Sequence, residues 1–238
     1  MNLLDSIIGA YREGEYEAAL RHVEGLREVE FLRAPYYFFR GSLLHQLGKL
    51  EEAEASLRQG LPLEKDAKQR ALVCNTIGSV LLDQQRFREA LSFKELAVQI
   101  CPERGSNLRG VAEVWLFQGL ETAKALSYAK QAVDIDRNER SASRDVSDMR
   151  LGEDLVVLAW AMALDSGYAL TPEPLLSEAL PMCIATNSKP ILAHFHYYAG
   201  KTYRALESGE KALENFVRAT QIDRQGRYGR LARSEISL

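Results

Sequence analysis

The stretch GEYEAAL, residues 14–20, decides the fold, because the chain returns to its pattern several times. It combines a glycine, an aromatic residue and two alanines among residues that favour helix. Related stretches follow at 48–57 (GKLEEAEASL), 85–93 (QRFREALSF), 120–128 (LETAKALSY) and 208–216 (SGEKALENF). A pattern that recurs in this way indicates a repeated structural unit.

The separation between the alanines of successive stretches gives the length of that unit. Ala19, Ala53, Ala90 and Ala125 follow one another at separations of 34, 37 and 35 residues. Such a steady separation is typical of stacked repeats. The 87 residues between Ala125 and Ala212 leave room for two longer units.

Each unit has the pattern of two helices joined by a short turn. Residues 35–48 (PYYFFRGSLLHQLG) predict a first, apolar helix, and residues 50–61 (LEEAEASLRQGL) predict an amphipathic second helix. Long alternating runs of β-branched residues, which would indicate strands, are absent from the sequence. The sequence therefore predicts an all-α fold. Small residues are expected where helices cross closely, and they recur in both helices of the units: Gly41, Gly78, Gly200, Ala19, Ala53, Ala90, Ala125 and Ala212.

Two units carry a fuller set of small, aromatic and proline positions. These are Ile77, Gly78, Leu81, Phe87, Ala90, Ala97 and Pro102 in one unit, and Ala199, Gly200, Tyr203, Ala212, Phe216 and Ala219 in the other. With these residues the chain resembles the tetratricopeptide repeat (TPR) family. The resemblance implies a right-handed superhelical solenoid of stacked antiparallel helix pairs.

The chain is expected to form one continuous solenoid that contains one irregular stretch. Residues 1–139 are expected to form four TPR-like helix pairs, and residues 140–192 a divergent, longer pair with a polar insertion. A final repeat at 193–226 and a capping helix at 227–238 complete the stack, because an exposed apolar end needs a cover. The polar stretch RNERSASRDVSDMR (137–150) predicts a long loop or a frayed helix start.

Composition excludes several classes of function. The 238 residues are 46% hydrophobic and 26% charged, with a formal net charge of −3, whereas a nucleic-acid-binding surface is normally basic. Neither a signal peptide nor an apolar run of about 18 residues is present, so we expect a cytoplasmic protein without a membrane partner.

The sequence also contains no pattern typical of an enzyme. Cys74, Cys101 and Cys183 are too scattered for a disulfide framework or a zinc site. The histidines of HFH, His194 and His196, would point about 200° apart on a helix, which disfavours a shared metal. Phosphate loops and nucleophile elbows are absent. We therefore expect no catalytic residues, no metal and no cofactor.

The resemblance implies that the first helix of each pair lines a concave groove that receives a peptide or a partner segment. Asparagine can hold a peptide backbone with a donor and an acceptor, and lysine or arginine can hold a carboxylate. Simple solvent exposure within the groove is the equally open alternative for any one position. The residues that the resemblance places on this face are Phe38, His45, Asn75, Ser79, Asp83, Phe117, Gln118, Tyr197, Lys201 and Arg204.

The function expected from the sequence is that of a non-catalytic protein–protein interaction module or assembly scaffold. One alternative is a regulatory domain that senses a ligand and changes the pitch of its superhelix. The other is a self-associating scaffold, and therefore a homo-oligomer. Residues 1–67 hold 12 acidic and 8 basic side chains and residues 200–238 hold 5 and 8, a difference that would suit contact between copies.

Overall fold

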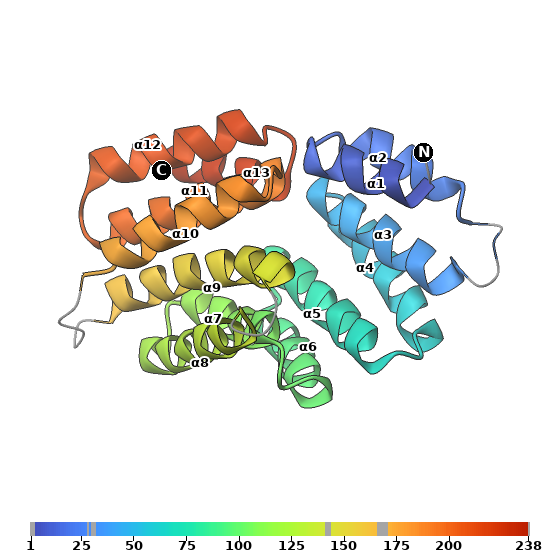
Figure 1. Ribbon diagram of the computed structural model, residues 1–238, viewed down its shortest axis with the longest axis horizontal. Coiled ribbons are helices and arrows are strands. Elements are labelled where there is room, and N and C mark those ends of the chain that lie inside the picture. Colours follow the sequence, from blue (N-terminus) through green and yellow to red (C-terminus); the bar gives the residue numbers. More distant parts are fainter. Residues whose placement is uncertain (1–2, 28, 30–31, 141–143, 166–170, 238) are drawn as a thin grey trace. The chain divides into compact units, whose positions relative to one another are not determined.

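Helices form all the regular secondary structure in the residues that the computed structural model describes, which are 3–27, 29, 32–140, 144–165 and 171–237. This agrees with the all-α repeat fold that the sequence predicts (Figure 1). The helices divide between two compact units. Unit 1 is Met1–Pro102 together with Gln225–Arg227, and unit 2 is Glu103–Arg224 together with Tyr228–Leu238.

Unit 1 consists of three helix pairs, in which each helix packs on the next one along the chain. A short 3₁₀ helix, Leu61–Leu63, follows the second pair. The helices are α1 (Leu3–Arg12), α2 (Tyr16–Glu24), α3 (Arg33–Gln46), α4 (Leu50–Gly60), α5 (Ala67–Asp83) and α6 (Phe87–Ile100).

Unit 2 holds three further pairs and most of a last helix. The polar stretch expected as a loop or frayed start is helical on both sides of residues 141–143, and those three lie outside the described residues. The helices are α7 (Gly105–Gln118), α8 (Thr122–Arg140), α9 (Arg144–Leu164), α10 (Glu173–Ala185), α11 (Lys189–Ala205), α12 (Gly209–Ile222) and α13 (Arg227–Ile236).

Glycines lie where the two helices of a pair approach most closely. A Cβ atom added to Gly41 would lie 2.5 Å from Leu57 Cγ, and one added to Gly200 would lie 2.6 Å from the ring of Phe216. Carbon atoms do not approach so closely, so only glycine fits between the helices at these positions. This explains glycine in helix interiors despite its cost of about 1 kcal/mol relative to alanine.

The turns inside the pairs use residues in the left-handed region of backbone conformation. Gly14 (φ 73°) and Gly48 (φ 77°) adopt it in the first two pairs. Gln85 (φ 60°) and Glu207 (φ 57°) adopt it in later pairs, although side chains disfavour this conformation. Gly119 (φ 65°) adopts it between α7 and α8, so two of the later turns, at Gln85 and Glu207, lack the glycine that marks the others in the sequence.

Replacing Ala90 with leucine is expected to destabilise the protein by about 1–3 kcal/mol, because Ala90 on α6 is 0% exposed and a larger side chain overpacks the crossing. Urea denaturation followed by circular dichroism measures the loss. Glu95→Leu, at an exposed position of the same helix, is the matched control and should change the midpoint little. An unchanged midpoint for Ala90→Leu would show that this crossing has room to spare.

Candidate functional site

In unit 1, three of the predicted groove residues lie one turn apart on α5. Asn75, Ser79 and Asp83 are spaced by four residues and therefore share a face of the helix. Lys94, on α6, donates hydrogen bonds from Nζ to Asn75 Oδ1 (2.7 Å) and to Ser79 Oγ (2.7 Å). A lysine from the second helix of the pair thus brings its ammonium group to the predicted face of the first.

The position of the Lys94 side chain explains why residue 78 is a glycine. Lys94 is 1% exposed, and its Cγ, Cδ and Cε atoms would lie 2.8–2.9 Å from a Cβ on Gly78. The aliphatic stem therefore occupies the space that a side chain at position 78 would take. Gly78 permits a buried lysine as well as a close helix crossing.

Asp83 ends the α5 stripe and is paired on two sides within unit 1. His45 Nε2 lies 2.8 Å from Asp83 Oδ2, while Arg227 binds both carboxylate oxygens, from Nε at 2.7 Å and from Nη2 at 2.6 Å. Burial alone would raise the pKa of Asp83, but the charges of Arg227 and His45 outweigh burial and hold the pKa well below its usual range. Phe38 is half-buried on α3, with its ring 5.7 Å from that of Phe39.

In unit 2, three predicted residues of α11 converge on one carboxylate, that of Glu235 on α13. Lys201 Nζ donates to Glu235 Oε1 at 3.0 Å, and the hydroxyl of Tyr197 lies 3.4 Å from the same oxygen. Arg204 pairs with Oε2 through Nη1 and donates from Nη2 to the backbone oxygen of Glu235 at 2.8 Å. We call Tyr197, Lys201 and Arg204 the carboxylate clamp.

Aromatic rings surround the base of the carboxylate clamp. Phe117 on α7 stacks on Tyr197 with ring centroids 6.5 Å apart and planes 11° apart. Lys201 Nζ lies 5.3 Å from the ring centroid of Trp160 on α9 and 5.9 Å from that of Phe117. Rings at these distances attract an ammonium group, so they help to position Lys201. Gln118, the remaining predicted residue, is half-buried at the end of α7.

Sequence reasoning missed Lys94, Trp160, Arg227 and Glu235. Lys94 lies on the neighbouring helix of its pair, 15 and 19 residues from its partners, whereas Arg227 is separated from Asp83 by 144 residues. The one usable signal was the spacing of Lys201 and Arg204 on one face of α11, which predicted a bound carboxylate but not its source.

A buried ionic network lies apart from the predicted stripe in unit 2. Arg109 on α7 donates to Asp154 Oδ1 at 2.7 Å and to Glu153 Oε2 at 2.9 Å on α9. A Cβ on Gly105 would lie 2.7–2.8 Å from one oxygen of Asp136 and one of Asp154. Burial raises the pKa of both aspartates, most strongly that of Asp154, although Arg109 counteracts it. These charges join helices to one another.

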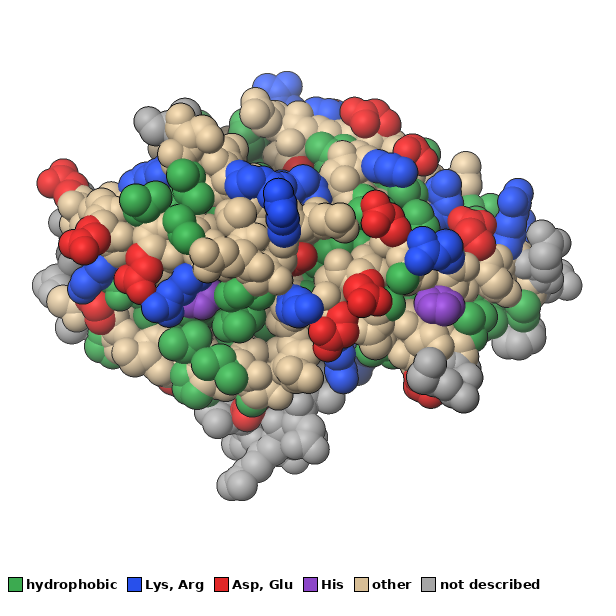
Figure 2. Space-filling model, turned by 90° about the horizontal axis from the view of Figure 1, so that it is seen from above, with side chains coloured by type: hydrophobic (Ala, Val, Ile, Leu, Met, Phe, Trp, Pro, Cys, Tyr) green, Lys and Arg blue, Asp and Glu red, His purple; other side chains and the backbone are tan. Residues whose placement is uncertain are grey.

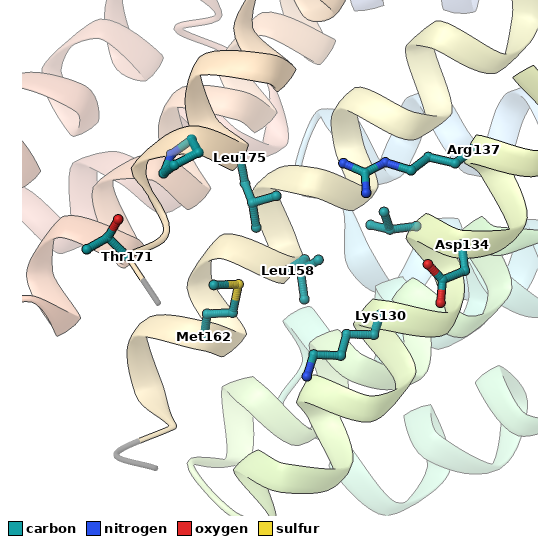
Figure 3. Close-up of a pocket in the computed structure, with 9 residues that line it drawn as sticks. Lys130, Asp134, Arg137, Leu158, Met162, Thr171 and Leu175 are labelled. Carbon is teal, nitrogen blue, oxygen red and sulfur yellow. The ribbon is translucent and has the colours of Figure 1, made fainter. Parts of the chain in front are cut away.

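A pocket of about 400 Å³ opens between α8, α9 and the start of α10 (Figure 3). Its apolar lining includes Leu158, Met162 and Leu175, and Lys130, Asp134 and Arg137 of α8 contribute charge. Arg137 is also paired with Glu178 at 2.8 Å. The side chains of this pocket differ from those of the carboxylate clamp in having both signs of charge.

The surface carries both signs of charge as well. Lys and Arg side chains are interspersed with Asp and Glu on the face that Figure 2 presents. Within the described ranges, no three His, Cys, Asp or Glu side chains are grouped so that they could hold a metal ion. None of the helices found there has the length and apolar character needed to cross a membrane.

Comparison with known proteins places these helix pairs in a fold family. The model of the tetratricopeptide repeat matches residues 34–66, which include α3 and α4. Part of the chain is 32% identical over 104 residues to the protein O-mannosyl-transferase Tmtc1 of Drosophila melanogaster. That match covers 42% of this chain and 12% of the relative, so the chain corresponds to a small part of it.

Solved structures with low sequence identity share the fold. The apo form of RapI is 13% identical, with coverage of 99% of this chain and 97% of that one and a TM-score of 0.61. BtubC from P. vanneervenii is 17% identical (93% and 91% covered, TM-score 0.52), and PilF of Pseudomonas aeruginosa is 16% identical (98% and 96% covered, TM-score 0.51). Together with the repeat matched at residues 34–66 and the observed helix pairs, these likenesses show that the chain has the fold of stacked tetratricopeptide-type helix pairs.

Proposed function

We propose that this protein is a non-catalytic interaction module that binds an acidic segment of a partner protein at the carboxylate clamp. Stacked helix-pair repeats present extended surfaces that generally serve protein–protein interaction. The observation that carries the proposal is the convergence of Tyr197, Lys201 and Arg204 on a carboxylate of a peptide chain, here Glu235.

The chemistry of the clamp suits this ligand. A lysine and an arginine supply charge-assisted hydrogen bonds, which are roughly twice as strong as neutral ones. Lys201 is 20% exposed and is flanked by Phe117 and Trp160, so its charge is partly shielded from water and held in place. A positioned, partly desolvated cation binds a carboxylate more selectively than a mobile surface lysine does.

In unit 1 we propose a secondary contact rather than a second clamp. Phe38 supplies an apolar ring, and Asn75 and Ser79 supply polar groups beside the ammonium of Lys94. Asp83 is engaged with Arg227 and His45 is engaged with Asp83, so we assign both to holding Gln225–Arg227 in unit 1.

Replacing Arg204 with glutamate should weaken partner binding about tenfold or more, because it puts a negative charge where a carboxylate has to bind. The measurement is affinity capture from the native cell extract, followed by titration of the captured protein by calorimetry. The thermal midpoint should change little, since Arg204 is 42% exposed and exposed ion pairs contribute about 0–1 kcal/mol.

Arg218→Glu provides the matched control. Arg218 on α12 is 54% exposed and pairs with Glu214 at 2.6 Å, so this variant has the same charge change away from the clamp. A protein retained by wild type and by Arg218→Glu but lost by Arg204→Glu supports the proposal. Equal retention by all three chains would refute it.

Two other outcomes separate the alternatives expected from the sequence. A mass that rises with concentration, and is altered by Arg204→Glu, would identify the partner as a second copy of the chain. A change in small-angle scattering on addition of a small ligand would favour a sensor.

A further inference from the structure

We propose that the last turn of α13 is a built-in occupant of the carboxylate clamp, which a partner segment carrying an acidic residue followed by an apolar one displaces. This inference rests on the proposed function, because it names the chemistry of the partner and the contact that regulates the same site. The observations that carry it are the unequal anchoring of the two ends of α13 and the pocket beside Glu235.

From Tyr228 onward, the first turns of α13 are fixed in the core of unit 2. Tyr228 is 9% exposed, and its ring centroid lies 4.7 Å from that of His194 and 5.7 Å from that of Tyr197. Ala232, one turn later, is 0% exposed. A Cβ on Gly229 would lie 1.8 Å from the backbone oxygen of Asp223, so the backbone approaches too closely for any side chain there. This part of the helix is held by packing.

The last turn is held differently. Ile236 is 39% exposed, and Glu235 is joined to the rest of unit 2 by its contacts with the clamp. The side chain of Glu235 is 13% exposed, whereas Lys201 and Arg204 are 20% and 42% exposed, so water reaches both cations and screens their pairing with the carboxylate. A helix end with few buried apolar contacts opens locally at low cost while the remainder stays folded.

The clamp has room for one carboxylate. Tyr197 and Lys201 both engage Oε1 of Glu235, and Arg204 engages Oε2 and the backbone oxygen of the same residue. A second carboxylate at this place would lie beside the first with no added cation, and like charges at close range repel. Glu235 and an acidic residue of a partner therefore exclude each other.

The neighbouring pocket defines the second feature of the partner. It measures about 240 Å³ and is lined by the charged Arg204, Glu207 and Glu235 together with Gly209, Ala212, Leu213 and Ile236. Leu213 is 50% exposed, so part of this apolar wall faces water. The clamp would bind an acidic side chain, and the apolar wall beside it would bind a branched apolar side chain that follows in the sequence. Glu235 and Ile236 of this chain are such a pair.

The test uses the full chain and a synthetic probe. The probe is the acetylated, amidated pentapeptide of residues 233–237 (RSEIS), titrated by NMR against the side-chain signals of arginine and lysine. Wild type should bind it weakly, because the competing last turn is already in place. Glu235→Gln should bind it roughly three- to tenfold more tightly, since loss of the native charge frees the clamp for a larger share of the time.

Further chains sharpen the comparison. Glu235→Arg should expel the last turn by repulsion from Lys201 and Arg204 and should give at least the gain of Glu235→Gln. Glu210→Gln, an exposed position in the first turn of α12, removes one carboxylate elsewhere and should bind the probe as wild type does. A probe in which glutamine replaces glutamate should not bind any chain.

The outcomes separate the two proposals. Equal affinity for the probe in wild type, Glu235→Gln and Glu235→Arg, with weaker binding by Arg204→Glu, would overturn the built-in occupant but leave the proposed function standing. Binding that Arg204→Glu does not weaken would overturn the proposed function as well. Absence of binding even to Glu235→Arg would also overturn the inference.

Discussion

Replacing Phe216 with alanine is expected to destabilise unit 2 by about 3–5 kcal/mol, the range for removing a fully buried aromatic side chain. Phe216 on α12 is 0% exposed, and its ring lies against Gly200 and 6.0 Å from the ring of Tyr197. Because Gly200 has no side chain that could fill the space, the cavity should stay open and the loss should lie at the upper end of the range.

Urea denaturation followed by circular dichroism measures this loss. Leu213→Ala is the matched control, because Leu213 lies on the same helix but is 50% exposed, so its truncation should cost well under 1 kcal/mol. If Phe216→Ala and Leu213→Ala shifted the midpoint equally, the ring of Phe216 would not be part of a closed core.

Replacing Arg109 with methionine is the second substitution with a large expected effect, a loss of about 3–5 kcal/mol near neutral pH. Methionine keeps the bulk of the side chain but leaves Asp154, whose side chain is 0% exposed, without its partner at 2.7 Å. A buried carboxylate that loses its compensating charge strongly destabilises the folded state. Arg137→Met, which removes an arginine 46% exposed and paired with Glu178, should cost far less.

The cost of Arg109→Met should shrink as the pH is lowered. Burial already raises the pKa of Asp154 well above its usual range, and Arg109 is the charge that counteracts this. Without Arg109 the pKa rises further, so the folded state takes up a proton that the unfolded chain, with a carboxyl pKa of about 4, does not hold. Unfolding free energies at pH 8 and pH 5 measure the difference. A cost that is equal at both values would show that Asp154 is not the group left unpaired.

Much of the fold follows from local pattern alone. The recurring alanines predicted the helix pairs, and Ala19, Ala53, Ala90 and Ala125 are all 0% exposed in the structure. The glycines predicted at close crossings are there for the stated reason, as Gly41 against Leu57 shows. Local sequence is sufficient here because a helix crossing needs only a small residue at a fixed position in each unit.

The candidate site depends on pairs that are distant in sequence, and local pattern does not contain them. Lys201 and Arg204 were predicted to hold a carboxylate, but the 31 residues from Arg204 to Glu235 gave no indication that the chain supplies one. Lys94 is one of several charged residues on an amphipathic helix, where solvent exposure is the usual outcome. The space left by the absent side chain of Gly78 lets the Lys94 stem pass between α5 and α6. That contact between Lys94 and Gly78 exists only once the two helices are packed.

The two sets of buried aspartates give the units opposite responses to acid. In unit 2 the pKa values of Asp136 and Asp154 are raised, so that unit gains stability as the pH falls from those raised values toward the ordinary carboxyl value of about 4. In unit 1 the pKa of Asp83 is lowered. The stability from its pairing with Arg227 is therefore complete above the ordinary carboxyl value of about 4 and is lost as the pH falls from there toward the lowered pKa. Through these groups mild acid stabilises unit 2, whereas stronger acid removes the contribution of Asp83 to the stability of unit 1.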